Sequence, residues 1–368
     1  MIERALASVS LGAVERNCAR LRAGGAPRQS AAARLCAVVK ADGYGHGAIE
    51  CARAARDGGA EWIAVATARE AAELRAGSVE GPLLVMGALT AEDAVMAVEA
   101  RADVVAWDAE AMRALPAGAR VHVKLDTGMG RLGTKDPVQA HALLDEAARR
   151  PDLELVGLMT HFATADEAGD EHFPAQLERF GAFAAEARER HPDLIMHAAN
   201  SAATLRDPAS HFDMVRCGVA IYGLDPFQED PAAHGLEPAL ALESYAAAVK
   251  RFEAGESAGY GRRWTAAEPT WVATLPIGYG DGWRRALGNG CDVLIGGRRL
   301  PLVGTVSMDN VTVDLGAETD VRAGDPAVLI GAQGGERILA EEVAGRLQTI
   351  NYEITCGLTP RVLRLYDR

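Results

Sequence analysis

Residues that could do chemistry stand at the ends of apolar runs in the first two-thirds of the chain. Lys40 closes one such run, while Arg216 lies inside another and is followed closely by Gly218. A lysine amine can bond covalently to a carbonyl group, and glycine lets backbone N–H groups approach a phosphate. A guanidinium within an apolar run needs a partner because it is always charged. Together these residue types suggest a site for pyridoxal phosphate.

Taken singly, each polar group of this kind has an ordinary explanation. A lysine that follows a strand is usually solvated, and His161 alone could be a core histidine with satisfied hydrogen bonds. The coincidence of such groups on five apolar runs favours a common site. These groups are Lys40, Lys124 with Asp126, Thr160 with His161, Asn200 with Ser201, and Arg216.

The elements that would position these groups are short runs rich in Val, Ile and Leu. Stretches with helical composition, such as 67–77 and 137–150, lie between them. Continuous apolar runs predict strands covered on both faces, and alternation with helices predicts parallel pairing. Eight units suggest a closed (β/α)8 barrel, while periodicity alone also allows an open doubly wound sheet. The runs are 35–40, 62–66, 82–87, 103–107, 120–126, 153–162, 194–200 and 214–223.

The carboxyl ends of the strands form the active-site face of such a barrel, and phosphate binds after its last two strands, where Gly218 falls. After about residue 235 the sequence changes to short strand-like pieces separated by Gly, Pro and Asp. The Pro-rich, acidic segment 225–240 is the predicted linker. We therefore expect an α/β protein with a TIM barrel in residues 1–234 and a mainly antiparallel β domain in residues 235–368.

Composition narrows the range of partners. The 368 residues include 51 acidic and 38 basic side chains, and the net charge of −13 argues against nucleic acid and an anionic membrane. A small soluble substrate fits better. The six cysteines show no CxxC pair or zinc-site spacing, so we expect no metal. Charges interrupt the start at Glu3, Arg4 and Glu15, and no stretch approaches the roughly 20 apolar residues of a membrane span, so the cytoplasm is the expected compartment.

The motif AVVKADGYGHGA at 37–48 resembles the cofactor-attachment motif of the alanine racemase family. The resemblance continues over almost the whole chain in the order of the family. It implies an isomerase that interconverts L-alanine and D-alanine with pyridoxal phosphate and supplies D-alanine for peptidoglycan synthesis. The other matching motifs are VKLDTGMGRLG at 123–133, GLMTHFATAD at 157–166, ANSAATL at 199–205, MVRCGVAIYG at 214–223, AGYGRRW at 258–264, LPIGYGDGW at 275–283, VGTVSMDN at 303–310 and INYEITC at 350–356.

The resemblance implies a mechanism with two bases. Lys40 would hold the cofactor and act on one face of the substrate, and Tyr260 would act on the other. Inversion needs both, because a single base usually returns the proton to the face from which it came. His161 and Arg216 would stabilise the tyrosine as a base, and Arg216 would also face the pyridine nitrogen.

The resemblance also implies the binding residues and a partner. Arg131 would contact the cofactor and the substrate carboxylate, and Lys124, often carboxylated in this family, would orient it. Tyr260, Tyr279 and Met308 would reach into the barrel of a second subunit, so a head-to-tail homodimer with composite sites is expected. The phosphate would be held by Tyr44, Ser201, Tyr352 and the backbone of Gly218 and Val219, and the substrate pocket would include Met308, Asp309 and Tyr279.

Departures from the family pattern are small. Gly280 replaces an alanine of many relatives, which we attribute to backbone tolerance, and Cys217 is interpreted as a small buried side chain. Three rival functions are compatible with the barrel. A racemase of broader specificity would typically carry an export signal, a non-catalytic pyridoxal phosphate carrier would lack the second domain, and an amino acid decarboxylase would show further acidic and cysteine motifs.

Overall fold

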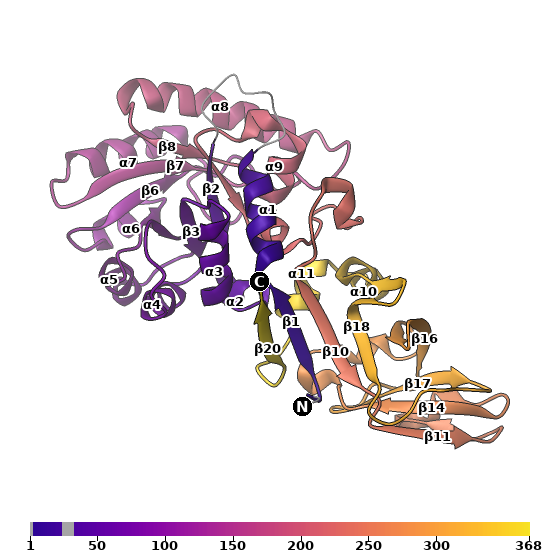
Figure 1. Ribbon diagram of the computed structural model, residues 1–368. Coiled ribbons are helices and arrows are strands. Elements are labelled where there is room, and N and C mark those ends of the chain that lie inside the picture. Colours follow the sequence, from indigo (N-terminus) through magenta and orange to yellow (C-terminus); the bar gives the residue numbers. More distant parts are fainter. Residues whose placement is uncertain (1–2, 24–32) are drawn as a thin grey trace. The chain divides into compact units, whose positions relative to one another are not determined.

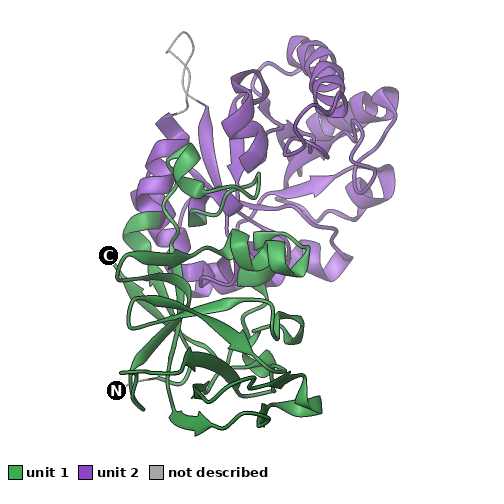
Figure 2. Ribbon diagram, turned by 90° about the vertical axis from the view of Figure 1, so that its right-hand side faces the viewer, with its two compact units in different colours: residues 1–13, 222–368 green, residues 14–221 purple. Residues whose placement is uncertain are grey.

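The computed structural model describes residues 3–23 and 33–368. Its contacts divide the chain into two compact units, shown in different colours in Figure 2. The barrel unit comprises residues 14–221, and the β unit comprises residues 1–13 and 222–368. The boundaries of these units differ from those of the predicted domains, 1–234 and 235–368. The domain boundaries remain a prediction.

The barrel unit contains eight parallel strands, one for each apolar run of the sequence. Strands β2, β3, β6, β7 and β8 are labelled in Figure 1. Strand β2 pairs with both β3 and β9, so the first strand of the series meets the last. The predicted barrel is therefore confirmed, and the open sheet is excluded. The strands are β2 (Arg34–Val38), β3 (Trp62–Val65), β4 (Leu83–Val85), β5 (Val104–Ala106), β6 (Arg120–Lys124), β7 (Glu154–Met159), β8 (Ile195–His197) and β9 (Met214–Cys217).

Two seams complete the ring of strands. The ladders form two four-stranded groups, β4-β3-β2-β9 and β5-β6-β7-β8. An isolated parallel bridge between Leu84 and Asp103 joins β4 to β5. At the other seam, the Asp213 N–H donates to the Met196 carbonyl at 3.0 Å, and the Arg216 N–H donates to the Ala199 carbonyl at 2.9 Å.

Helices separate the strands of the barrel unit, and two of them begin where the sequence predicts. Helix α4 follows a capping box of Thr67 and Glu70, and α7 has Asp136 as its N-cap and Pro137 in its first turn. The helices in the sequence of this unit are α2 (Lys40–Tyr44), α3 (Ala48–Asp57), α4 (Ala68–Ala76), α5 (Ala91–Glu99), α6 (Ala109–Ala114), α7 (Pro137–Arg149), α8 (His172–Arg190) and α9 (Ser201–Arg206), while α1 (Leu11–Ala23) begins before residue 14.

The last apolar run is only partly a strand. Strand β9 ends at Cys217, and a 3₁₀ helix covers Val219–Tyr222. Between them, the Gly218 N–H donates to the Ser201 hydroxyl at 3.0 Å instead of continuing a ladder. A buried segment is apolar whether it stays extended or turns. The sequence pattern therefore does not show that β9 ends at Cys217.

The β unit is built on a ten-stranded sheet with the path β11-β14-β17-β16-β15-β18-β10-β1-β20, and β19 pairs with β18. Its pairs are antiparallel except for β1 with β20, which agrees with the predicted β domain. The strands are β1 (Leu6–Ser10), β10 (Leu240–Tyr245), β11 (Ala248–Phe252), β14 (Thr270–Leu275), β15 (Asp292–Ile295), β16 (Arg298–Val303), β17 (Val311–Gly316), β18 (Pro326–Gln333), β19 (Glu336–Ile338) and β20 (Leu363–Asp367).

Alternation of buried and half-buried residues along β10 and β17 shows that one face of this sheet packs against a core. A separate two-stranded ladder joins β12 (Ser257–Ala258) to β13 (Trp264–Thr265), and the helices of the unit are α10 (Ala340–Leu347) and α11 (Asn351–Cys356). Strand β1, which the sequence analysis does not predict, pairs with β10 and β20, so the start of the chain belongs to this sheet.

The segment 225–240, predicted as a linker, begins with a packed turn. Asp225 is fully buried, its N–H donates to Glu341 at 2.9 Å, and Asn351 Nδ2 donates to the Asp225 carbonyl at 2.8 Å. The linker interpretation is wrong for this part of the segment, because its acidic residue serves as a buried hydrogen-bonding centre.

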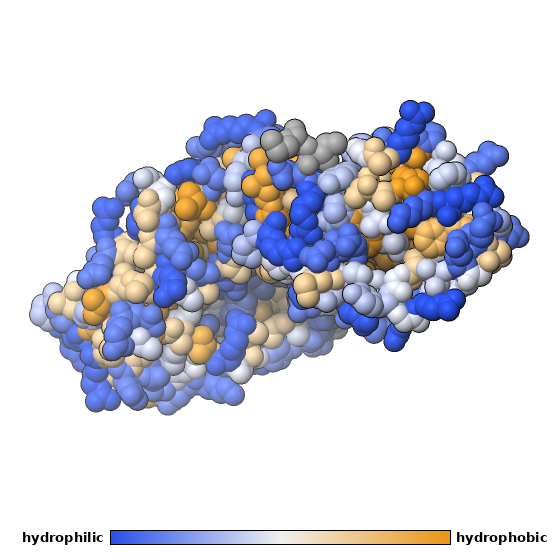
Figure 3. All heavy atoms as spheres, turned by 90° about the horizontal axis from the view of Figure 1, so that it is seen from below, coloured by the Kyte–Doolittle hydropathy of each residue, from blue (hydrophilic) through white to orange (hydrophobic). Residues whose placement is uncertain are grey.

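Polar residues cover most of the face shown in Figure 3, and apolar residues gather there in separate small groups. Within residues 3–23 and 33–368, no helix combines the length and the apolar composition needed to cross a bilayer. Five of the six cysteines are buried, and Cys356 is exposed.

Candidate active site

Lys40 opens a turn of unusual backbone geometry at the carboxyl end of β2. The next three residues are left-handed, with φ and ψ of 52° and 52° at Ala41, 51° and 49° at Asp42, and 61° and 42° at Gly43. Tyr44 follows with a φ of 53°. Left-handed geometry costs an L-residue roughly 1–2 kcal/mol, and such strain persists only where the surroundings impose it. Strain of this kind concentrates at ligand sites.

Carboxylates hold this turn in place. Glu70 accepts the Ala41 N–H at 2.7 Å, and its other oxygen accepts the N–H groups of Ala66 and Thr67. Asp42 accepts the N–H of Ala48 at 3.0 Å. Glu70 therefore ties the residue after Lys40 to the end of β3 and the start of α4.

Tyr44, Ser201, Gly218 and Val219, predicted to contact phosphate, gather at the ends of β2, β8 and β9. The Ser201 hydroxyl accepts the N–H groups of Gly218 and Ala220 at 3.0 and 3.3 Å. A Cβ atom on Gly218 would lie 2.3 Å from the Tyr44 hydroxyl oxygen, so only glycine lets this hydroxyl approach the backbone. Hydroxyl groups and accessible backbone at such a position suit a phosphate.

Arg216 is buried, with 3% of its surface exposed. Its guanidinium donates to Nδ1 of His197 at 2.9 Å, to Nδ1 of His161 at 3.2 Å, and to the carbonyls of Thr160 and Ala198 at 2.7 and 3.0 Å. Burial lowers the pKa of Arg216 to about 10, so the group stays charged at neutral pH. The partner that a buried arginine needs is thus a set of four neutral acceptors.

Several cations surround His161. Burial, and then the charge of Arg216, lowers the pKa of His161 well below its usual value, and the charges of Lys124, Arg131 and Lys40 act in the same direction. Lys124 is 4% exposed, and burial followed by Arg216 and Arg131 lowers its pKa to about 8. His161 is therefore neutral, and the cluster favours an anionic ligand.

The loop that carries Arg131 is organised by Asp126. This carboxylate accepts the N–H groups of Gly128, Met129 and Gly130 at distances of 2.7 to 3.1 Å. Burial alone would raise the pKa of Asp126, but these backbone donors outweigh burial and lower it. The sequence TGMG therefore forms a compact turn that leads to an exposed Arg131.

The remaining predicted site residues belong to the β unit. Tyr260, at the start of a 3₁₀ helix, is 72% exposed, while Tyr279 is 41% and Met308 51% exposed. Their loops are joined by backbone hydrogen bonds, from Tyr279 to the Ser307 carbonyl at 3.0 Å and from Gly280 to the Met308 carbonyl at 2.9 Å. The Thr305 hydroxyl donates to the Tyr260 carbonyl at 2.8 Å. Tyr352 lies in α11 and is half-buried.

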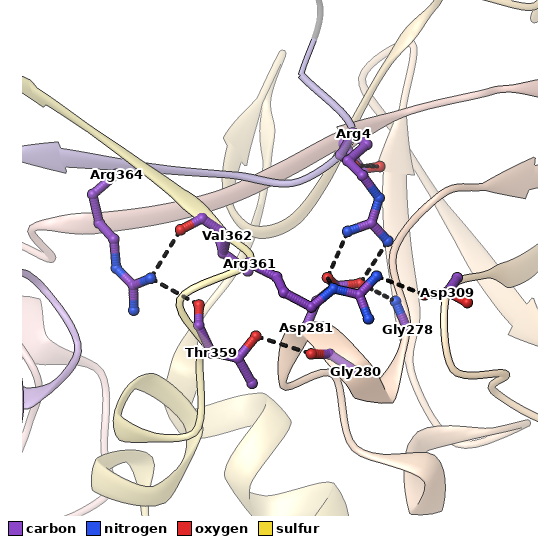
Figure 4. Close-up of polar contacts among 10 residues, drawn as sticks. Arg4, Gly278, Gly280, Asp281, Asp309, Thr359, Arg361, Val362 and Arg364 are labelled. Carbon is purple, nitrogen blue, oxygen red and sulfur yellow. Dashed lines mark hydrogen bonds and ion pairs between the residues drawn. The ribbon is translucent and has the colours of Figure 1, made fainter.

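An ion-pair cluster fixes Asp309 beside these loops (Figure 4). Arg361 lies 2.6 Å from Asp309 and 3.3 Å from the buried Asp281, which also accepts two hydrogen bonds from Arg4 at 2.6 and 2.9 Å. A Cβ on Gly280 would lie 2.3 Å from Nη1 of Arg361. Gly280 thus makes room for a side chain, which the explanation from backbone tolerance missed.

Sequence reasoning also missed Glu70, His122, His197 and Asp103. The signal for His122 is the period-2 spacing of Arg120, His122 and Lys124 on β6, which places three polar residues on one face of a barrel strand. Cys217 is buried as predicted, and burial raises the pKa of its thiol to about 12. It is therefore a poor nucleophile.

Two family matches cover most of the chain. Residues 9–226 match the family described as alanine racemase, N-terminal domain, and residues 239–366 match alanine racemase, C-terminal domain. The chain is 44% identical to the alanine racemase of Symbiobacterium thermophilum over 98% of its length and 96% of that protein. It is 42% identical to alanine racemase 1 of Bacillus subtilis, with coverage of 90% and 86%.

Solved structures agree with these matches. The alanine racemase from D-cycloserine-producing Streptomyces lavendulae has a TM-score of 0.92 and 37% identity, covering 100% of this chain and 98% of that one. The alanine racemase from Bacillus anthracis with bound L-Ala-P has a TM-score of 0.89 and 34% identity, with coverage of 100% and 96%. The chain therefore belongs to the alanine racemase family.

Proposed function

We propose that this chain interconverts L-alanine and D-alanine with pyridoxal phosphate as cofactor. The observation that carries the proposal is the convergence, within the barrel unit, of Lys40 on its left-handed turn with a cluster of cations and with the Tyr44 hydroxyl, which packs directly against the backbone of Gly218. The relative solved with bound L-Ala-P supports alanine as the amino acid.

The residues present fit this cofactor. Lys40 would hold it covalently, while Tyr44, Ser201, Tyr352 and the backbone of Gly218 and Val219 would bind its phosphate. The absence of a side chain at Gly218 supports this assignment, because it lets the Tyr44 hydroxyl lie against the backbone N–H groups of this loop. When bound, the cofactor supplies an electron sink that makes the Cα proton of the amino acid acidic.

Lys40 and Tyr260 would move that proton on opposite faces of the substrate Cα. A phenol works as a base only where positive charge or hydrogen bonds stabilise the phenolate. The neutral His161, which accepts a hydrogen bond from Arg216 at Nδ1, has its Nε2–H left to donate to such a group. Arg216 would face the cofactor ring nitrogen as a donor that does not give up its proton.

Arg131 would bind the substrate carboxylate, and Lys124 would orient it. A pKa of about 8 leaves part of the Lys124 amine neutral near physiological pH, which is the form that reacts with carbon dioxide. The carboxylated side chain would be an anion beside Arg131 and Arg216, and would thus reverse the unfavourable charge at this position. Carboxylation of Lys124 is therefore part of the proposal.

Tyr279, Met308 and Asp309 would shape the substrate pocket, and Tyr260, Tyr279 and Met308 would complete the barrel site of a second subunit. The large exposed fractions of these three side chains support a homodimer with composite sites. Supply of D-alanine for peptidoglycan and location in the cytoplasm complete the proposal.

The decisive experiment follows L-alanine in deuterated water with the purified enzyme loaded with pyridoxal phosphate. D-Alanine should form with deuterium at Cα, and L-serine and L-lysine should turn over more slowly. Faster turnover of L-lysine would favour the broader racemase, loss of carbon dioxide the decarboxylase, and no turnover the non-catalytic carrier. Lys40→Ala should lose the cofactor absorbance near the visible edge, and a normal band would overturn the attachment site.

A further inference from the structure

A line of hydrogen-bonded side chains crosses the interior of the barrel unit. Nη1 of Arg216 lies 2.9 Å from Nδ1 of His197, and Nε2 of His197 lies 2.8 Å from Nδ1 of His122. Nε2 of His122 lies 3.1 Å from Oδ2 of Asp103. Asp103 directly precedes β5, so the line runs from the candidate site toward the amino ends of the strands. We refer to Arg216, His197, His122 and Asp103 as the buried chain.

The two ends of the buried chain determine the direction of every link. A guanidinium only donates, so Nδ1 of His197 accepts and the proton of this ring is on Nε2. That Nε2–H donates to Nδ1 of His122, whose own proton is then on Nε2 and is donated to Asp103. A carboxylate only accepts, so both ends require the same tautomer of both rings.

Neutral imidazoles are essential to this arrangement. Both histidines are fully buried, and burial followed by the charge of Arg216 lowers the pKa of His197 well below its usual value. A neutral ring has one donor and one acceptor nitrogen, so each histidine satisfies both of its neighbours. The charge of Arg216 is thereby linked to the carboxylate of Asp103 through two polarised rings.

Neighbouring groups fix the rings and the carboxylate. A Cβ on Gly157 would lie 2.3 Å from Nδ1 of His122, so this glycine of β7 gives the ring its space. Trp62 packs edge-on against His122 with ring centroids 5.7 Å apart. Arg120 Nε donates to Oδ1 of Asp103 at 2.8 Å, which leaves Oδ2 to accept from His122.

We propose that Asp103, at the amino end of β5, is a positioning residue that sets the tautomers of His122 and His197 and thereby holds the guanidinium of Arg216 in place. The proposal rests on the proposed function only in that Arg216 would face the cofactor ring. Its test is the tautomer of each histidine, which can be measured without turnover.

Asp103→Asn should set the two ends of the buried chain against each other, and reversal of both rings is the expected result because the proposal makes residue 103 the end that sets their tautomers. Arg120 can only donate, so it takes the single amide oxygen, and the amide NH2 faces Nε2 of His122. His122 must then accept at Nε2, and the proton of each ring moves to Nδ1. The Nδ1–H of His197 would then face the N–H of Arg216, and the two donors repel each other.

A second variant distinguishes the direction of the hydrogen bonds from the packing of side chains around residue 103. In Asp103→Asn combined with Arg120→Met, no guanidinium claims the amide oxygen, so the amide can turn its oxygen toward His122 and restore the original tautomers. Arg120→Met alone keeps the carboxylate and should leave the tautomers unchanged. This variant is the matched control for loss of the arginine.

The measurement is the ¹⁵N chemical shifts of the side chains in cofactor-loaded enzyme labelled at its nine histidines, with assignments from His122→Gln and His197→Gln. In the unaltered enzyme both rings should carry the proton on Nε2; a proton on Nδ1 or on both nitrogens of either ring would overturn the proposal even if no variant folds. Asp103→Asn should move both protons to Nδ1, and unchanged rings in a folded variant would equally overturn it.

Turnover provides the second readout. Asp103→Asn should lower kcat about tenfold, a change of about 1.4 kcal/mol in the barrier, and raise the share of alanine that is released as pyruvate with its amino group transferred to the cofactor. The double variant should recover much of the lost kcat and should form less pyruvate than Asp103→Asn. If the tautomers behave as expected while neither the parent nor any variant racemises alanine, the proposed function fails and the positioning role stands. If the parent racemises alanine but the tautomers do not respond to Asp103→Asn, the proposed function stands and the positioning role fails.

Discussion

The Tyr44 hydroxyl oxygen lies 2.3 Å from the position that a Cβ atom would occupy on Gly218. Tyr44 ends α2, the helix after β2, and Gly218 directly follows β9, so the segments after the first and last strands of the barrel meet at this point. A side chain at 218 has to displace the tyrosine, which itself sits at a left-handed φ of 53° on the Lys40 turn. A larger side chain at position 218 would therefore also disturb the turn that carries Lys40.

Gly218→Ala should weaken binding of pyridoxal phosphate about tenfold, since a clash of this kind typically costs about 1–3 kcal/mol. The dissociation constant can be measured by titrating the cofactor absorbance. Gly181→Ala is the matched control, because a Cβ on this helical glycine meets nothing within 4 Å. Equal affinities of the two variants would contradict the assignment of this loop to the phosphate.

Glu70→Ala should destabilise the Lys40 turn. The substitution removes the acceptor of the Ala41, Ala66 and Thr67 N–H groups, so we expect the free energy of unfolding to fall by about 1–3 kcal/mol. Urea denaturation measures this change. Glu73→Ala, at an exposed position of the same helix, should stay within about 0.5 kcal/mol of the parent. A loss no greater than that of the control would show that the left-handed turn does not depend on Glu70.

Lys124→Met should change how stability depends on pH. The folded pKa of about 8 lies below the ordinary value of 10.5, so the folded state disfavours the charged amine. Between these values the unfolded chain holds a proton that the folded chain has released, and the free energy of unfolding of the parent rises with pH. Below pH 8 the penalty is present in full and amounts to roughly 3 kcal/mol.

The variant lacks this titration, so it should be more stable than the parent at pH 7 and should show a flatter profile between pH 8 and 10.5. Denaturation is measured in buffer free of carbon dioxide, because a carboxylated lysine would carry the opposite charge. Parallel profiles of parent and variant would show that the amine is not shifted. Addition of ¹³C-bicarbonate to the parent then tests carboxylation directly through the carbamate signal.

Much of the barrel is predictable from the sequence because its strands are buried on both faces. Each of the eight apolar runs contains a strand, since continuous apolar stretches that are buried on both faces suit a parallel sheet. The polar residues at their carboxyl ends follow from the same argument, and Lys124, His161 and Arg216 are electrostatically coupled in the structure. In a closed barrel the carboxyl ends of all strands lie on one face, so the topology brings these groups together.

What the sequence does not show depends on pairs of residues far apart in the chain. The first strand joins a sheet through β10 and β20, and nothing local in Leu6–Ser10 distinguishes this partner from a barrel strand. The left-handed turn after Lys40 includes Ala41 and Tyr44, whose intrinsic preference is against it. Similarly, the link from His122 to Asp103 joins β6 to the residue before β5 and has no local sequence signature.

Tyr260→Phe tests the two-base mechanism through the exchange of each enantiomer. If Lys40 serves one face and Tyr260 the other, the variant should bind pyridoxal phosphate normally, because the substitution leaves the barrel unit unchanged. It should still exchange the Cα proton for solvent deuterium in the enantiomer whose Cα proton faces Lys40. Exchange into the other enantiomer, and racemisation, should fall by at least about a hundredfold, in the range typical of a lost general base.

The deuterium content of L-alanine and D-alanine, incubated separately in deuterated water, gives the two exchange rates. Tyr366→Phe is the control for removal of an exposed phenol elsewhere in the β unit and should match the parent. Comparable losses for both enantiomers would indicate that Tyr260 acts on binding rather than on one proton. Unchanged exchange of both would leave Lys40 as the only base, and inversion would then need a different group on the opposite face.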